Sequence, residues 1–79
     1  QNARLFAHLN IAQADAGILA WAAKFEHEQL RPVTAIHLAN SDGNPQTIGD
    51  PTWQSFLPTP PFPDYVSGHS TFGAAAAAV

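Results

Sequence analysis

Apolar residues are so dense in the first third of the chain that a helix here has almost no polar face. The run extends from Leu5 to Phe25 with few polar interruptions. It predicts a helix from about Ala3 to Leu30, with a break near Asn10. A helix of this kind is normally covered by neighbours on several sides. Since the rest of the chain is too short to provide them, we expect this segment to belong to a larger helical bundle.

The pattern downstream predicts two further helices separated by a long loop. Pro32 is a good first helical residue, and the second helix is expected to continue to about Ala39. Residues 40–66 contain six of the seven prolines together with Asn, Asp and Gly, which is the composition of a loop. The last helix is expected to start between Ser67 and His69. The predicted fold class is therefore all-α, a fragment of a helical bundle in which a long Pro-rich loop joins two helical parts.

Length and charge narrow the functional classes. A chain of 79 residues without cysteine has no disulfide to stabilise a small core. The alanine run that ends at Val79 carries no helix stop signal, and we expect residues 1–79 to be one partial domain truncated at both ends. The net charge of −3 argues against a general nucleic-acid surface. Charged residues interrupt the longest apolar run, so no membrane span is expected.

The segment Ser67-Gly68-His69 is the first candidate for chemistry. It follows the Pro-rich loop and leads directly into an alanine-rich helix. The first turn of a helix has unpaired N–H groups and the positive end of the helix dipole, which favours anions. Gly68 allows close approach of the main chain, Ser67 can cap or donate, and His69 can move a proton. A plain capped helix start is the alternative interpretation of Ser67 and Gly68.

Lys24 and Arg31 form the second candidate cluster. Seven positions on a helix amount to almost two turns, so the two side chains are expected to project from nearly the same face. Pro32 disfavours helical geometry at Arg31, which places the arginine at a helix end. An ammonium and a guanidinium fork suit a tetrahedral oxyanion. Solvated surface charges are the alternative.

Lys-x6-Arg-Pro followed by Ser-Gly-His resembles the first two motifs of the type 2 phosphatidic acid phosphatase and vanadium haloperoxidase superfamily. The bacterial haloperoxidase-like branch of this superfamily has sequences similar to two segments of the chain. They are Arg31-Pro-Val-Thr-Ala-Ile36 and Thr59-Pro-Pro-Phe-Pro-Asp-Tyr-Val-Ser-Gly-His-Ser-Thr-Phe72. Val66 departs from the proline usual before Ser-Gly-His. The third motif, an Arg followed by a His and an Asp, is not found in the chain. The three other histidines all precede Ser-Gly-His, so the vanadate-ligating histidine has no counterpart here.

The resemblance implies a role for each matching residue. Lys24, Arg31, Ser67 and Gly68 would bind vanadate or phosphate, and His69 would be the catalytic acid–base group. In chloride-oxidising members of the superfamily, aromatic residues line the apolar side of the oxyanion pocket. Trp21 and Phe62 occupy the matching positions in this chain. Ordinary core packing is the alternative for both.

Two enzyme functions and one binding function remain open. The first is a haloperoxidase that uses vanadate as cofactor and hydrogen peroxide and halide as substrates. The second is an acid phosphatase that hydrolyses phosphate esters at the same site without a cofactor. The third is a non-catalytic piece in which Leu57–Pro63 docks as polyproline on an aromatic groove. The family resemblance favours a secreted or periplasmic location, and the fragment alone is expected to be inactive.

Overall fold

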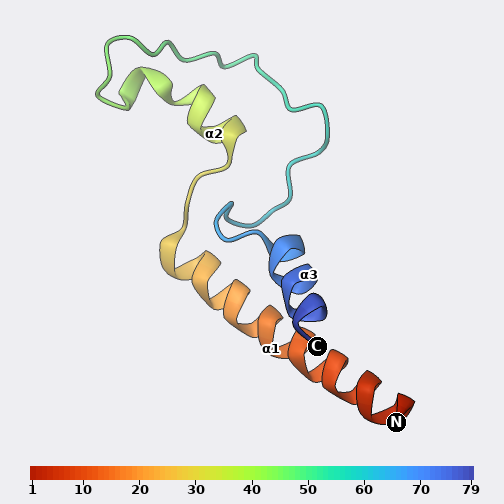
Figure 1. Cartoon of the computed structure of the whole chain (residues 1–79). Coiled ribbons are helices and arrows are strands. Elements are labelled where there is room, and N and C mark those ends of the chain that lie inside the picture. The colour runs from red at the N-terminus through yellow and green to blue at the C-terminus, as the bar shows by residue number, and fades with distance from the viewer.

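All regular structure in the protein is helical. The computed structural model describes residues 1–79 and contains no strand (Figure 1), which confirms the all-α prediction. The elements in chain order are α1 (Asn2–His27), α2 (Pro32–His37), the 3₁₀-helix η1 (Ala39–Ser41) and α3 (Gly68–Ala78).

Helix α1 is continuous, and the predicted break near Asn10 is wrong. The Asn10 side chain donates from Nδ2 to the Phe6 carbonyl one turn back, at 2.8 Å, so it is satisfied inside the helix instead of interrupting it. The predicted end at Leu30 is also wrong, because α1 ends at His27. Glu28 takes the left-handed conformation with φ 48°, and its N–H donates to the Lys24 carbonyl. This is a helix C-terminal turn of a kind usually made by glycine.

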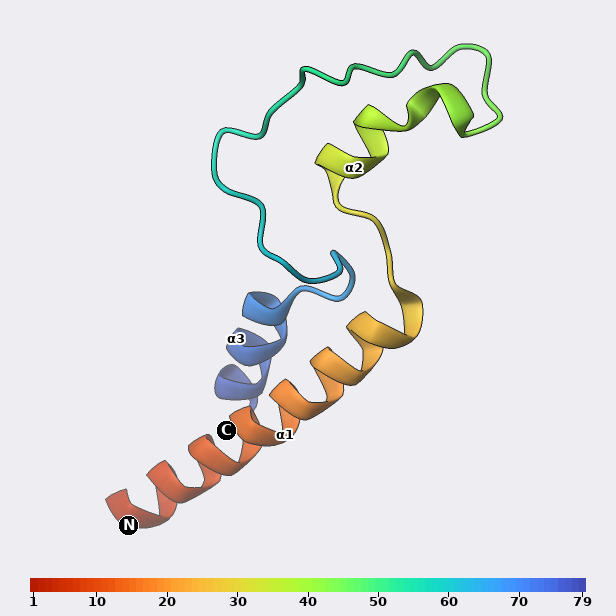
Figure 2. The ribbon, with the colours of Figure 1, turned by 180° about the vertical axis from the view of Figure 1, so that it is seen from behind.

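Helix α3 packs antiparallel against the C-terminal part of α1 (Figures 1 and 2). Small residues on α1 allow the approach. Ala16 and Ala20 are buried one turn apart on the same stripe. A Cβ added at Gly17 would lie 3.0 Å from the Phe72 ring, so this glycine makes room for an aromatic side chain of α3.

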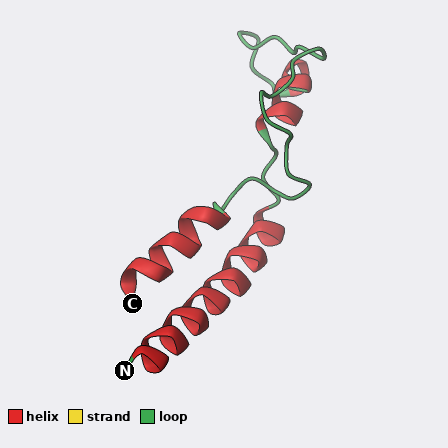
Figure 3. Ribbon diagram, turned by 90° about the vertical axis from the view of Figure 1, so that its right-hand side faces the viewer, coloured by secondary structure: helices red, strands yellow, loops and turns green.

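Helix α2 and the following loop form a separate lobe at the far end of the molecule (Figure 3). The predicted helix to Ala39 is too long by two residues, because the chain tightens into η1 after His37. Two hydrogen bonds bring the loop back onto α2: the Asp50 N–H donates to the Ile36 carbonyl at 3.1 Å, and His37 Nε2 lies 2.7 Å from the Trp53 carbonyl oxygen. No helix or strand lies between η1 and α3, so the long Pro-rich loop is present as expected.

The chain buries very little of its apolar surface. Only three residues are buried, and the radius of gyration is 17.5 Å, whereas a compact domain of this length has about 12 Å. No helix has the length and apolar character needed to cross a membrane. Large apolar side chains of α1 are exposed, as the sequence pattern led us to expect: Leu5, Phe6, Ile11, Ile18, Leu19 and Phe25.

Candidate oxyanion site

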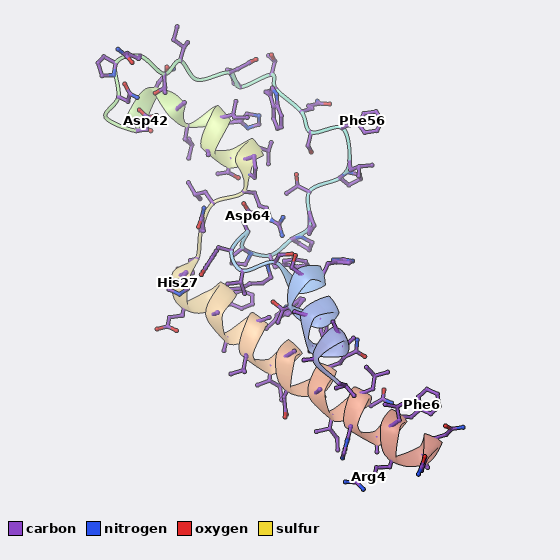
Figure 4. All side chains as sticks on the ribbon, in the orientation of Figure 1. Arg4, Phe6, His27, Asp42, Phe56 and Asp64 are labelled. Atoms are coloured by element: carbon purple, nitrogen blue, oxygen red, sulfur yellow. The ribbon has the colours of Figure 1, made fainter.

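One pocket brings together all seven residues singled out in the sequence. It has a volume of about 400 Å³ and lies where α3 begins beside the C-terminal half of α1. Pro60, Asp64 and Phe72 complete the lining of the pocket. Figure 4 places Asp64 at this junction of helix and loop. The seven predicted residues in the lining are Trp21, Lys24, Arg31, Phe62, Ser67, Gly68 and His69.

Lys24 is the most deeply buried polar residue of the chain, with 1 % of its surface exposed. Its ammonium donates to the carbonyl of Pro63 at 2.9 Å and to that of Asp64 at 3.0 Å. The same Nζ lies 5.0 Å from the centre of the Phe62 ring and 5.8 Å from that of Trp21. Carbonyl dipoles and aromatic faces thus offset the cost of burying the charge. Two of its three N–H donors are in use, so the third has no hydrogen-bond partner within the chain.

Arg31 reaches the same loop segment from the other side. Its Nε donates to the Phe62 carbonyl at 2.9 Å, and Nη2 lies 3.4 Å from the Pro63 carbonyl. The guanidinium carbon is 5.1 Å from the centre of the Phe62 ring. Arg31 itself is extended, with φ −69° and ψ 151°, as Pro32 requires.

Lys24 and Arg31 therefore do not project from one helix face, contrary to the prediction, although both side chains line the same pocket. Helix α1 ends at His27, so the two residues do not share a helix. They meet because both side chains bind the backbone of residues 62–64. The expected position of Arg31 at the end of the helix that carries Lys24 is also wrong, because Arg31 is the N-cap of α2.

The N-terminus of α3 presents free donors to the pocket. Ser67 is the N-cap, and its Oγ accepts a hydrogen bond from the Ser70 N–H at 3.2 Å. The hydroxyl proton of Ser67 therefore stays available to a ligand. The N–H groups of Gly68 and His69 have no acceptor within the chain. Three donors at the positive end of a helix dipole make a suitable place for an anion.

Gly68 also has a packing reason to be glycine. A Cβ at this position would lie 3.1 Å from Trp21 Cζ3 and 3.2 Å from Cη2. The indole thus rests directly against the main chain of the first turn of α3. The contact fixes the position of the free amides relative to α1, which carries Lys24.

His69 lines the pocket with an exposed imidazole that makes no hydrogen bond within the chain. An imidazole in this state is free to exchange protons with a bound ligand. None of the other histidines lines the pocket. His27 packs edge-on against Tyr65 with ring centres 5.4 Å apart, and His37 contacts the Trp53 carbonyl.

Trp21 and Phe62 form an apolar wall beside the cations. Their ring centres are 5.4 Å apart, and Phe72 adds a third ring 6.3 Å from Trp21. The rings pack on one another and line the pocket at the same time, so the packing interpretation and the pocket interpretation are compatible. An apolar wall excludes water and strengthens the electrostatic interactions of the neighbouring charges.

Asp64 also lines the pocket, although it was not among the site residues predicted from the sequence. Its Oδ1 lies 3.2 Å from Arg31 Nη1 in the only ion pair of the chain. Its position three residues before Ser67 is the one signal in the sequence; that Lys24 and Arg31 both bind this segment is seen only in the structure.

The donor set fits a tetrahedral oxyanion such as vanadate or phosphate. Two cations, a hydroxyl and two free amides converge on one pocket, and all of them donate hydrogen bonds. No group of three or more His, Cys, Asp or Glu side chains in the chain could hold a metal ion. The fold and the pocket therefore define an all-helical protein in which two cations and the start of a helix line one pocket.

Comparison with known proteins identifies the family. Residues 4–79 match the family model of the VCPO second helical-bundle domain. The chain is 43 % identical over 83 residues to vanadium chloroperoxidase of Curvularia inaequalis; the match covers 92 % of the chain and 13 % of that protein. The chain belongs to the vanadium haloperoxidase superfamily, as its motifs indicated. No solved structure matches the chain.

Proposed function

We propose that this chain provides part of the active site of a vanadium-dependent haloperoxidase, which oxidises halide with hydrogen peroxide. The observation that carries the proposal is the convergence of Lys24, Arg31 and the first turn of α3 on one pocket. The 43 % identity to vanadium chloroperoxidase supports the same chemistry. Because the chain spans 13 % of the length of that relative, the activity is proposed for the full-length protein, meaning these 79 residues with any that precede or follow them.

Five residues of the pocket would hold vanadate. Lys24 and Arg31 would neutralise the charge of the oxyanion, and the Ser67 hydroxyl and the amides of Gly68 and His69 would donate to its oxygens. When bound, vanadate supplies the Lewis-acidic centre at which hydrogen peroxide is activated. The fixed charges are expected to contribute more to catalysis than proton transfer does, because preorganised electrostatic stabilisation is usually the largest single contribution.

His69 would be the proton carrier of the reaction. Its ring is exposed, lines the pocket and forms no hydrogen bond with another group of the chain. A ring nitrogen can therefore accept a proton from hydrogen peroxide and return it to the leaving oxygen. General acid–base help of this kind is typically worth about 10²–10⁴-fold.

Trp21 and Phe62 would shape the halide side of the pocket. Their rings lie 5.4 Å apart beside the Lys24 ammonium. A weakly hydrated anion such as a halide gains from an apolar wall next to a fixed positive charge, because the wall keeps competing water away. This feature favours the peroxidase over the phosphatase.

The Pro-rich docking function fits the structure less well. Within Leu57–Pro63, Phe62 packs on Trp21 and the Pro63 carbonyl accepts a hydrogen bond from Lys24. A partner groove would have to compete with these contacts. Phe56, just before the segment, projects freely into solvent (Figure 4).

The test is peroxide consumption by the full-length protein in the presence of chloride or bromide, with and without added vanadate. Halide oxidation that requires vanadate is expected. Hydrolysis of a phosphate ester that vanadate inhibits, without halide oxidation, would replace the proposal by the acid phosphatase alternative. His8→Ala is the matched control for His69→Ala, since His8 is exposed on α1 and does not line the pocket.

A further inference from the structure

Asp64 is the only acidic side chain that lines the pocket. Its Oδ1 accepts a hydrogen bond from Arg31 Nη1 at 3.2 Å, and the side chains of Arg31 and Asp64 are 21 % and 39 % exposed. The carboxylate therefore occupies one arm of the guanidinium fork on which a bound oxyanion would depend.

Backbone hydrogen bonds hold Asp64 in the place where its carboxylate meets Arg31. The Asp64 N–H donates to the Gln29 carbonyl at 3.1 Å, and the Asp64 carbonyl accepts from Lys24 Nζ at 3.0 Å. The residue is thus bound from the segment between α1 and α2 and from α1 itself. Its backbone cannot move away from Arg31 without breaking hydrogen bonds to two elements.

The charges of the pocket show what the carboxylate does. Two cationic side chains and one carboxylate line it, so the ionised side chains of the lining sum to +1 instead of +2. An oxyanion entering the pocket meets the Asp64 charge as a repulsion and must share Arg31 with it. The exposed share of the carboxylate lets it stay hydrated when Arg31 turns to another anion.

We propose that Asp64 is a built-in counter-anion that competes with the oxyanion for Arg31 and so sets how tightly the site holds its ligand. The inference rests on the proposed oxyanion-binding function and goes beyond it by assigning a residue that limits affinity. Asp64 acts through Arg31 and is a positioning residue.

Asp64→Asn in the full-length protein tests the inference. The amide oxygen can still accept the hydrogen bond from Arg31, so the substitution removes the charge and keeps the contact. Affinity for inorganic phosphate and for orthovanadate is measured by titration calorimetry. We expect both to bind at least about fivefold tighter, since two unit charges about 4 Å apart repel by roughly that factor even in water. Asp64→Ser removes the same charge and is expected to tighten binding as well.

Two controls separate charge from structure. Asp64→Glu keeps the charge and is expected to retain wild-type affinity within about threefold. Asp15→Asn makes the same change of charge on the exposed face of α1, outside the pocket, and is expected to leave affinity unchanged. Unchanged or weaker binding in both Asp64→Asn and Asp64→Ser, including loss through misfolding, would overturn the inference, because a purely structural Asp64 can only weaken the site when it is removed.

The same titrations distinguish this failure from failure of the proposed function. Wild-type binding with no tightening in the two neutral variants overturns the role of Asp64 alone. Absence of binding in the wild type and in every variant overturns the oxyanion site as well. Binding that occurs in Asp64→Asn and is absent in the wild type would support the competition in its strongest form.

Discussion

Gly68→Ala tests whether the contact between α3 and Trp21 positions the oxyanion donors. The added Cβ would lie 3.1 Å from Trp21 Cζ3 and 3.2 Å from Cη2, closer than ordinary van der Waals contact. Either the indole or the first turn of α3 must shift by a few tenths of an ångström. A matched control exists in the same helix, because a Cβ added at Gly73 meets nothing within 4 Å.

Gly73→Ala is expected to stabilise the protein, whereas Gly68→Ala is expected to be neutral or destabilising. Gly73→Ala should stabilise the protein by about 0.8–1.0 kcal/mol, the helix propensity gained when Ala replaces Gly. Gly68→Ala gains at most the same amount and loses about 1–3 kcal/mol to overpacking against the indole. The difference between the two variants should therefore be roughly 1–3 kcal/mol. Oxyanion binding should weaken in Gly68→Ala, because its free amides move with the helix start.

Urea denaturation and vanadate titration of the full-length variants measure these effects. Trp21→Phe provides the decisive background, since phenylalanine lacks the outer indole ring that carries Cζ3 and Cη2. In that background Gly68→Ala should cost clearly less than in the wild type, as a double-mutant cycle will show. If the cost of Gly68→Ala is the same with Trp21 and with Phe at that position, the indole does not restrain α3 and the reasoning is refuted.

Three further outcomes are expected. His69→Ala should keep vanadate affinity and lower turnover by about 10²-fold or more; near-wild-type turnover would contradict the acid–base role. Arg31→Lys should weaken vanadate binding, since a fork that contacts three groups becomes a point charge, and equal affinity would place Arg31 outside the cradle. Hydrogen bonds from the Thr47 hydroxyl and the Asn44 N–H lower the pKa of Asp42. The stability that this gives is present above the ordinary pKa of about 4 and is lost as the pH falls through the lowered value, so Thr47→Val should reduce the loss of stability seen on acidification.

The presence of each helix was predictable from the pattern of side chains along the sequence. The exact ends of the helices were less predictable, because they depend on the conformation of single residues. The apolar run gave α1, and Pro32 gave the start of α2. A break was predicted near Asn10, yet the Asn10 amide donates to the carbonyl one turn back and the helix continues. The end at His27 depends on Glu28 in a left-handed conformation, which a non-glycine residue adopts only occasionally.

The exposed apolar surface of α1 agrees with the match to a helical-bundle domain, and the covering of this surface by further helices stays a prediction. Helix α3 is shorter than α1 and covers only its C-terminal part (Figure 1). Apolar side chains such as Phe6 and Ile18 remain open to solvent. Burying a side chain of this size is worth about 1.5–3 kcal/mol, so packing of further helices on this surface would add substantially to stability.

The residues of the pocket were predictable, and the way in which they are held was not. Lys24, Arg31 and Ser-Gly-His stand out because their side chains carry the chemistry. What brings them together is the backbone of residues 62–64, which accepts hydrogen bonds from both cations. Every residue has a carbonyl, so such a contact leaves no trace in residue type. The same segment carries Asp64, whose carboxylate sits beside Arg31 only because the main chain is bound at that point. Sequence therefore identifies the groups that would meet an oxyanion, while the balance between attraction and repulsion at the site depends on a loop geometry that sequence does not display.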